Sequence, residues 1–379
     1  MNSSQMLAWA ALPAATATVM LLPLLPALRE WWRPRDTRPL HIDAQDALDP
    51  TYMARSFSAR LAESVARGDR KLGQSRLMLA PGRGSWPLKD DEWKRGRNAH
   101  VWHAAADVQM PDGVHFLGEV ATPATLETAP GCVYRALWAG ASLRLAEHGH
   151  LLRWAHGRQV EVGTGCRLAG RVTADETLTV WGRSFFLLLH APVISFGTRP
   201  GGQRIALAAP RRAEHGGLPP EVDWDPVSGR GVASGDLRCP EWSAWRGDLL
   251  CRGDLEIGTG SHADGSLKAH GELGLQAHCR IQGSVFAEGA IRVGENVQVL
   301  GNVCSETAIA LEPGCVIGSP ERPATVSAPR IDIGPGVIVH GTVWAAERGQ
   351  TRHETPVPPE TALVPAERRR RPSDERIEA

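Results

Sequence analysis

Apolar side chains recur every six residues through the last third of this 379-residue chain. Counting in sixes from Leu249 gives an apolar or small residue at every step to Cys315, and the position two further on is mostly apolar or small as well. After a four-residue insertion within 318–324, the pattern resumes at Thr325 and continues to Val343. Residues two apart on a strand point to the same face, so each unit predicts a short strand with two inward side chains. A fixed period of this kind indicates a solenoid.

Glycines repeat at three times this period. Gly247, Gly265, Gly283 and Gly301 recur once in every third unit, and each opens the phrase Gly–x–aliphatic–x–small. Gly341 opens the same phrase once the insertion is allowed for. A glycine at the same corner of every coil permits a backbone bend or a close approach that a side chain would hinder. We therefore predict an all-β fold, a parallel β-helix solenoid in which three successive units, each with one strand, make one coil.

The inward positions of the most regular coils give the predicted core. An alternative β-sandwich or hairpin array would have turns at irregular spacings of about 8–12 residues, which the strict six-residue period disfavours. The predicted core residues are Leu267, Leu273, Leu275, Ile281, Val285, Ile291, Val293, Val297, Val299, Val303, Ile309, Leu311 and Ile317.

A second, shorter stretch follows the same rule less strictly. It covers Gly157–Phe186, with Gly170 opening its phrase, and Gly118 opens a similar phrase earlier in the chain. Between Leu126 and Leu152 the phase is lost. We therefore predict a less regular β-helical segment, and the sequence leaves open whether the two segments stack into one rod.

The amino-terminal residues have a different pattern. Met6–Leu28 is an uncharged run that is long enough to span a bilayer, and prolines within it are tolerated in membrane helices. Trp31 and Trp32 follow, then Arg33 and Arg35, as expected at a cytoplasmic interface. A cleaved signal peptide would instead have a basic start and a shorter apolar run. We predict a retained single-pass anchor, with the bulk of the chain in the cytoplasm.

A helical stripe follows the predicted anchor. Met53, Phe57, Leu61 and Val65 are four residues apart, a spacing that predicts a short amphipathic helix. Two positions are open for this helix. It packs on the end of the solenoid as a cap, or its apolar face lies on the membrane.

The remaining segments lack the six-residue period. Arg199–Trp245 is rich in glycine, proline and charge, and the chain from Glu347 onward is polar and proline-rich, a composition that cannot bury a core. The run Arg368–Arg371 is interpreted as solvated, with contact to anionic lipid or nucleic acid as the alternative. The predicted divisions are a transmembrane anchor at 1–30, a juxtamembrane region with the helix at 31–112, an irregular β-helical segment at 113–195, an insertion at 196–246, the regular β-helix at 247–346 and a disordered tail at 347–379.

Charge and cysteine placement narrow the possible chemistry. The chain has 42 basic and 42 acidic residues, so bulk charge favours neither nucleic acid nor an acidic partner. Cys166, Cys251, Cys279 and Cys315 occupy inward positions, where a thiol behaves as a small hydrophobe. The sequence contains no CxxC pair, so a zinc ribbon or redox motif has no support. Reduced thiols fit the predicted cytoplasmic location.

Acyltransferases with hexad β-helices are the enzymatic alternative, with a CoA thioester as donor and a histidine as general base. The candidate histidines are His262, His270, His278 and His340. Each lies off the inward positions, and none has a companion acid or loop at a spacing that implies a site. The sequence also contains no P-loop, nucleophile elbow or convincing dinucleotide fingerprint. His340 or His278 would be the base in this alternative. We predict no catalytic, cofactor or metal site and a non-enzymatic protein.

The ends of the β-helix are expected to associate. A terminal coil has a neighbour on one side and unpaired N–H and C=O groups on the other, and such contacts repeated without closure give a filament. The last coil is among the most apolar, and the polar tail follows it directly. We predict a self-contact formed there by Val337, Val339 and Val343, or one formed by the amino-terminal coil.

The phrases in Gly265–Ser305 resemble the bactofilins, the bacterial polymer-forming cytoskeletal proteins. The resemblance extends over Gly247–Ala345 and, more loosely, over Gly157–Phe186. It implies a right-handed β-helix that polymerises end to end without nucleotide at the inner membrane. The function that follows is a membrane-anchored scaffold on the cytoplasmic face. Its partners would be further copies of itself, the inner membrane and envelope or cell-division proteins, and nucleic acid is not expected among them.

Overall fold

The computed structural model describes residues 11, 13, 15–33, 49–80, 100–113, 115–197, 217–225 and 227–352. The chain forms two compact units, Met1–Asp49 and Pro50–Ala379. The first unit contains the 3₁₀-helix η1 (Leu22–Leu24) and the α-helix α2 (Leu25–Trp32). The second contains the α-helix α4 (Tyr52–Arg67) and a β-solenoid.

Apolar side chains of the first unit are exposed to solvent, with Val19 at 73% and Trp32 at 86% of their full exposure. Pro23 lies within η1, which separates α2 from the helical residues that precede it. Among the described residues, no helix combines the length and the apolar character that crossing a membrane requires. Residues 1–10 of the predicted anchor lie outside the described residues.

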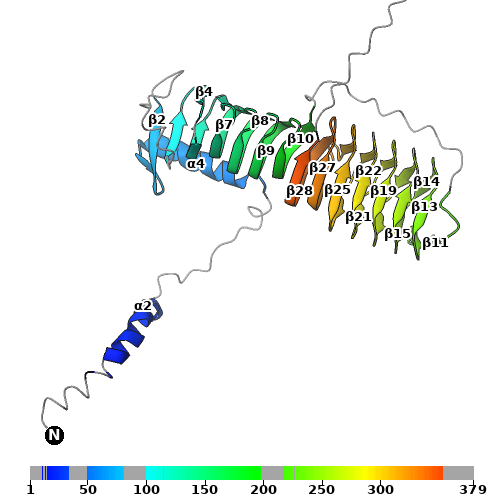
Figure 1. Ribbon diagram of the computed structural model, residues 1–379, viewed down its shortest axis with the longest axis horizontal. Helices are drawn as coiled ribbons and strands as arrows, with labels where there is room; N and C mark the ends of the chain where they lie inside the picture. Colours follow the sequence, from blue (N-terminus) through cyan, green and yellow to red (C-terminus); the bar gives the residue numbers. More distant parts are fainter. Residues whose placement is uncertain are drawn as a thin grey trace, which may run out of the picture. The chain divides into compact units, whose positions relative to one another are not determined.

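The first half of the solenoid winds from β1 to β10 (Figure 1). Its later strands are long because they continue around corners through β-bulges. The strands are β1 (Lys71–Leu72), β2 (Ser75–Ala80), β3 (Val101–Ala104), β4 (Val108–Gln109), β5 (His115–Thr122), β6 (Leu126–Glu127), β7 (Val133–Leu145), β8 (His150–Val162), β9 (Arg167–Val180) and β10 (Phe185–Phe196).

The second half winds from β11 to β28 in short strands, and most of these pair with the strand three elements later in the chain. The strands are β11 (Val222–Asp225), β12 (Arg230–Ala233), β13 (Leu237–Cys239), β14 (Ala244–Arg246), β15 (Asp248–Cys251), β16 (Leu255–Ile257), β17 (His262–Asp264), β18 (Leu267–Ala269), β19 (Leu273–Leu275), β20 (Arg280–Ile281), β21 (Val285–Ala287), β22 (Ile291–Val293), β23 (Gln298–Val299), β24 (Val303–Ser305), β25 (Ala308–Leu311), β26 (Val316–Ile317), β27 (Ala324–Ile333) and β28 (Ile338–Thr351).

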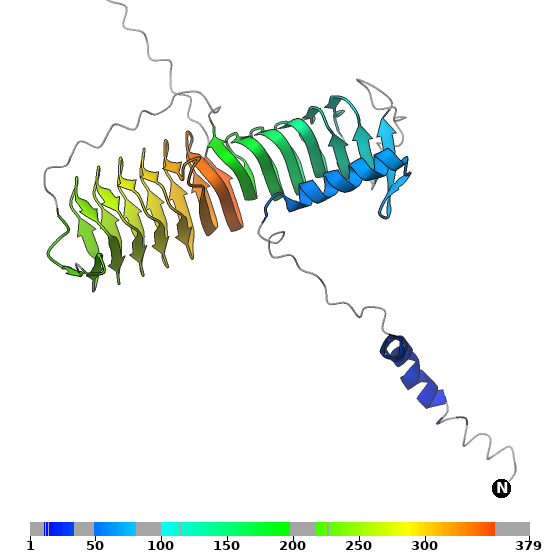
Figure 2. The same ribbon diagram turned by 180° about the vertical axis from the view of Figure 1, so that it is seen from behind.

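The two halves form one rod and wind toward each other. The first half ends at β10 in the middle of the rod, and the second begins with β11 at the far end and returns to the middle (Figures 1 and 2). There β28 pairs with β10 in antiparallel orientation, whereas nearly all other pairs are parallel. This arrangement confirms the predicted parallel β-solenoid and shows that its two segments stack. The handedness stays a prediction.

The core consists of inward side chains stacked in register from coil to coil. Leu267 pairs with Val285, and Val285 with Val303, so equivalent residues lie one above another. All thirteen of the predicted core residues have at most 2% of their surface exposed. Apolar burial of this kind contributes about 1.5–3 kcal/mol for each large side chain, so stacking stabilises coils that could not stand alone.

The corner glycines are required by close approach between coils. A Cβ at Gly265 would lie 2.1 Å from the carbonyl oxygen of Gly247, and a Cβ at Gly283 would lie 2.4 Å from that of Gly265. At Gly247 and Gly341 the backbone φ angles of +104° and +125° also lie in the region that side chains disfavour. The repeated glycine therefore allows the backbones of successive coils to touch at this corner.

Unequal coil lengths explain why the sequence period fails in the first half. His115 pairs with Val133, Val133 with His150, and His150 with Arg167. Each of the last two steps is one residue shorter than the first. One missing residue shifts the period, although the stacking continues.

The predicted boundary between the juxtamembrane region and the β-helical segment, at 112, is wrong, because β1 to β4 already belong to the solenoid.

Two boundaries of the second half also need correction. The first coil, β12 to β14, lies inside the predicted insertion. The sequence pattern did not reveal this coil because Gly231 replaces the aliphatic residue of the first inward position. At the other end β28 continues to Thr351, five residues into the predicted tail. Residues 353–379, which hold the rest of the predicted disordered tail, lie outside the described residues.

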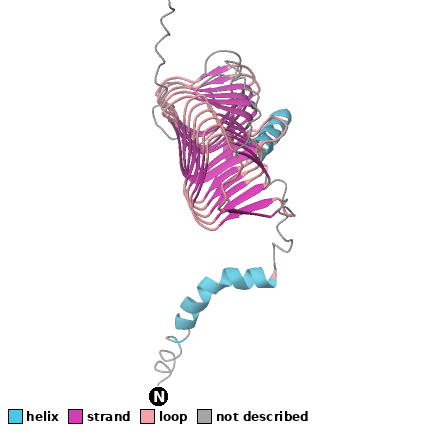
Figure 3. Cartoon of the chain, turned by 90° about the vertical axis from the view of Figure 1, so that its right-hand side faces the viewer, coloured by secondary structure: helices cyan, strands magenta, loops and turns pink. Residues whose placement is uncertain are grey.

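Helix α4 lies along the side of the first-half coils (Figures 2 and 3). Its buried face includes Phe57, whose ring meets Trp154 of β8 edge to face at 5.2 Å between centroids. Gly68 ends the helix in the left-handed conformation. The predicted helix is confirmed, but its predicted position on the end of the solenoid is wrong, because the apolar face rests on the flank. The same packing occupies the face that the alternative position would place on a membrane.

Candidate assembly interfaces

The junction between β10 and β28 is an end-to-end contact between two coils of the same chain. Leu189 is opposite Val343, and Ile194 is opposite Val339. All four side chains are fully buried. The last coil of each half therefore covers the last coil of the other.

The predicted self-contact at Val337, Val339 and Val343 is consequently wrong. Each of these side chains has 0% of its surface exposed, because β10 occupies that end of the second half. The pairing joins residues from distant parts of the sequence, with Ile194 opposite Val339. A periodic pattern reports which residues stack within a segment, and it carries no information about which segment lies beyond the last coil.

Two histidines bridge the junction. Nδ1 of His190 lies 2.9 Å from Oγ1 of Thr342, and Nδ1 of His340 lies 3.0 Å from the carbonyl oxygen of Pro192. Burial lowers the pKa of His190, and the positive charge of Arg171 lowers it further. His190 is therefore neutral near pH 7 and acts as a hydrogen-bonding group of the junction.

The end of the rod near β11 leaves two strand edges open. Among the described strands, β13 pairs only with β16 and β14 only with β17, while β11 covers only β12. Leu237 donates its N–H to the carbonyl of Asp254 at 2.8 Å. Because successive residues of a strand direct their N–H groups to opposite sides, Arg238 directs its N–H to the open side. This edge can accept another strand.

The opposite end of the rod has a shorter open edge. There β4 pairs only with β6 among the described strands, and Val108 donates its N–H to the carbonyl of Thr125 at 2.8 Å. Gln109 therefore directs its N–H away from the rod. The hairpin of β1 and β2 covers β3 beside it.

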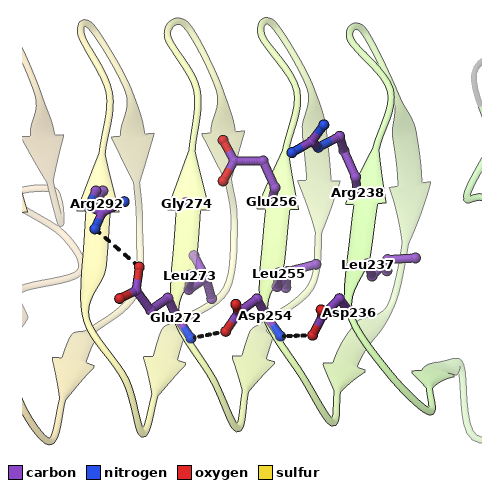
Figure 4. Close-up of a pocket in the computed structure, with 10 residues that line it drawn as sticks. All are labelled: Asp236, Leu237, Arg238, Asp254, Leu255, Glu256, Glu272, Leu273, Gly274 and Arg292. Atoms are coloured by element: carbon purple, nitrogen blue, oxygen red, sulfur yellow. Dashed lines mark hydrogen bonds and ion pairs between the residues drawn. The ribbon is translucent and has the colours of Figure 1, made fainter.

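A groove of about 420 Å³ crosses the outer face of the second half near the β11 end (Figure 4). Arg238, Glu256, Gly274 and Arg292 occupy equivalent outward positions on four successive coils. Gly274 leaves a gap in this row, and Arg292 makes an exposed ion pair with Glu272 at 3.1 Å. The described residues that line the groove are charged, leucine or glycine, and none of them is serine, cysteine or histidine.

Acidic residues beside the groove have a structural role. The N–H of Asp254 donates to Oδ1 of Asp236 at 2.9 Å, and the N–H of Glu272 donates to Oδ1 of Asp254 at 2.8 Å. At another corner the N–H of Ser266 donates to Oδ1 of Asp248 at 2.8 Å. Each carboxylate therefore accepts a hydrogen bond from the next coil, at a point where the ladder itself provides no acceptor.

The four candidate histidines of the enzymatic alternative do not converge. His262 pairs with Asp264 at 2.8 Å and His270 with Glu288 at 2.6 Å, both on the outer surface. His278 occupies an exposed corner with φ +61°, and His340 contacts Pro192 in the junction. None of the four lines the groove beside β13. Within the part of the chain that the structure describes, no group of three or more metal-ligating side chains is placed to hold an ion.

Six of the seven cysteines are buried, and all seven are unpaired thiols. Burial raises the pKa of Cys166, Cys239 and Cys315 to about 12 in each case, and that of Cys279 to about 11. These thiols are therefore protonated at neutral pH and contribute as small apolar groups. Cys304 differs because its side chain points outward and is half-buried.

Comparison with known protein families, curated proteins and solved structures finds no significant match to this chain.

The open edges belong to residues that sequence reasoning missed. Counting back one coil from Leu255 and Ile257 leads to Leu237 and Cys239, so the six-residue period did contain the first coil. Tryptophan at the inward position Trp245 and glycine at Gly231 concealed it.

Proposed function

We propose that this protein is a non-enzymatic scaffold of the bactofilin type, tethered to the membrane by its amino-terminal segment. Copies join end to end through the outer ends of the rod, without nucleotide. The open edges of β13 and β14 are the observation that carries this proposal. An unpaired edge templates the addition of another strand, and a repeated contact that does not close generates a filament.

The junction within the chain supports the same kind of contact between coil ends. At β10 and β28, two coils from separate solenoid segments already stack through backbone pairing and buried aliphatic side chains such as Leu189 and Val343. Coil ends of this sequence are therefore suited to docking on one another. Because that central contact is made within one copy, assembly uses the outer ends.

The tether is the part of the proposal that the amino-terminal sequence supports. Met6–Leu28 has no charged residue, and its described apolar side chains, including Leu22 and Leu25, are exposed to solvent. An exposed apolar surface of this kind is typical of a site that contacts a membrane or another protein. Flotation of the full chain with phospholipid vesicles tests this point, and recovery in the unbound fraction would contradict it.

Electron microscopy of the full chain in detergent, without nucleotide, tests the assembly. We expect end-to-end filaments or short rods of several copies. Arg238→Pro removes the N–H that β13 directs to the open side while leaving its bonds to β16, and proline is tolerated on an edge strand. This variant should remain folded and should not form filaments, whereas the matched control Arg238→Ala should assemble normally.

Discrete single rods of the parent chain at every concentration would overturn the proposal. Normal assembly of Arg238→Pro would instead show that the β13 edge is not the contact. In that case Gln109→Pro tests the edge of β4 in the same way, because Gln109 holds the equivalent position at the opposite end of the rod.

A further inference from the structure

One outward row of side chains runs along a single face of the rod, one residue from each coil, and includes the exposed aromatic rings of Trp344 and Phe286. We call the part outside helix α4 the lateral row. In order along the rod it consists of Asp223, Val232, Leu250, Lys268, Phe286, Cys304, Ser327, Trp344, Leu188 and Arg171.

The same row continues beneath α4, which shows what kind of contact this face makes. Beyond Arg171 it passes through Trp154, Ala136, Glu119 and Val101 to Leu77. Helix α4 packs over these residues and buries all of them except Glu119, which is partly exposed. Arg171 marks the end of the covered part, since its Nη1 donates to the carbonyl of Pro50 just before the helix. The lateral row is therefore the continuation of an established docking face.

Trp344 and Phe286 have 51% and 38% of their surfaces exposed. Leu250 and Val232 lie in the same row and are half-buried by their neighbours. A line of apolar side chains beside an interface of the same chain indicates a second contact.

The order of residues in the lateral row is complementary to itself when reversed. Turning a second copy end for end about the midpoint between Phe286 and Cys304 places these two residues opposite each other. The next positions outward are a polar pair, Lys268 and Ser327, followed by apolar pairs. The complete set of opposed residues is Phe286 with Cys304, Lys268 with Ser327, Leu250 with Trp344, Val232 with Leu188, and Asp223 with Arg171.

We infer that the lateral row binds the lateral row of a second copy, with the two rods antiparallel and related by a two-fold axis. Apolar side chains then meet apolar ones, the Lys268 ammonium can donate to the Ser327 hydroxyl, and Asp223 meets the opposite charge of Arg171. A contact in which each residue pair occurs twice is the expected form of a symmetric dimer. Glu288 and Glu306 lie at the corner beside the row and are exposed, so water and salt screen their negative charges.

A parallel arrangement of the rods is disfavoured by the same residues. It would place Lys268 opposite Lys268 and Asp223 opposite Asp223, so that each charge faces its own sign. It would also oppose Trp344 to Trp344 and Val232 to Val232, which leaves large side chains against large and small against small. The antiparallel arrangement avoids both mismatches.

The size of the row sets the strength of the contact. Ten positions separated by about 4.8 Å give a length of about 43 Å, and a three-residue strand is about 10 Å wide. The contact therefore covers about 400 Å² of each copy, about half of a standard interface. We expect dissociation on dilution and pairing at high local concentration, which a shared membrane surface supplies if the tether of the proposed function holds.

Cysteine cross-linking of the full chain in phospholipid vesicles tests the inference. In a Cys304→Ser background the remaining cysteines are buried, so a short bismaleimide reacts only with introduced thiols. Leu250→Cys and Trp344→Cys each add one thiol, and the antiparallel pairing places Leu250 of one copy opposite Trp344 of the other. Two copies of either variant alone would hold their thiols five coils apart, about 24 Å along the rod.

We expect cross-linked dimer when the two variants are mixed in the same vesicles, and none from either variant alone. Dimer from Leu250→Cys alone would show a parallel pairing and overturn the inference. Absence of dimer in the mixture would overturn it too, with labelling by a monofunctional maleimide confirming that both thiols are accessible.

Phe286→Asp separates this contact from end-to-end assembly. The variant should abolish cross-linking between Leu250→Cys and Trp344→Cys chains while leaving filaments in detergent intact, because Phe286 is remote from both ends of the rod. Arg238→Pro should have the reverse effect. Failure of lateral pairing can therefore be distinguished from failure of the proposed function.

Discussion

Nδ1 of His190 lies 2.9 Å from the hydroxyl oxygen of Thr342, and this hydrogen bond joins two halves of a solenoid that wind toward each other. The pair lies where the strand edges of β10 and β28 would otherwise be open in the middle of the rod. Its chemistry also makes the junction sensitive to acid, because the imidazole must stay neutral where it is buried.

Acidification should destabilise the junction. Burial and the charge of Arg171 lower the pKa of His190 in the folded state, and burial also lowers that of His156 despite the opposing charge of Asp175. The unfolded chain therefore binds protons first as the pH falls below the ordinary value of about 6.5. The free energy of unfolding should decrease from that pH downward and be fully present above it.

Urea unfolding at a series of pH values measures this effect. His190→Gln retains a hydrogen-bonding side chain beside Thr342 but does not titrate, so its urea midpoint should fall less steeply below about pH 6.5. A pH profile identical to that of the parent chain would assign the acid sensitivity to other groups.

Gly283→Ala should destabilise the second half strongly. A Cβ there would lie 2.4 Å from the backbone of Gly265, and neither backbone can move without shifting a coil. Forcing apart a packed contact of this kind costs about 1–3 kcal/mol. Gly235→Ala is the matched control, because a Cβ at Gly235 has no atom within 4 Å. Equal thermal midpoints for the two variants would refute the close-approach argument.

Phe57→Ala should loosen α4 while the coils remain stacked. Phe57 fills the space beside Trp154, and loss of a buried phenylalanine side chain costs about 3–5 kcal/mol. Because α4 lies outside the coils, the loss falls on helix docking, and amide hydrogen exchange should speed up in Tyr52–Arg67 more than in β7 or β8. Glu63→Ala, at an exposed position of the same helix, should leave both rates unchanged.

Arg352→Lys should fray the end of β28. The guanidinium of Arg352 binds both carboxylate oxygens of Glu312, at 2.7 and 2.9 Å, and also Asp332 at 3.2 Å. A lysine cannot make this forked contact. The groups are partly exposed, so we expect a loss of about 1 kcal/mol, seen as faster exchange of the Thr351 amide. Arg330→Lys provides an exposed comparison, and equal exchange in both variants would count against the role of Arg352.

Helix α4 illustrates where sequence reasoning stopped. Its helical spacing was readable, because Phe57 and Leu61 repeat at the helical period whatever they touch. Its docking site was not, because Ala136 and Trp154 occupy outward positions that the strand pattern treats as solvent-facing. Only the stacking of coils of unequal length brings these positions into one row beneath the helix.

The amino-acid sequence alone determined the solenoid, its inward residues and its corner glycines. These depend on local alternation and on a period that repeats between neighbouring coils. Tertiary structure decided which coil ends remain open, because the partner of Val339 is Ile194, in a segment with a different period and the opposite direction. Contacts between segments depend on how far each coil advances along the rod and turns about it. No single repeat specifies the total of these advances and turns.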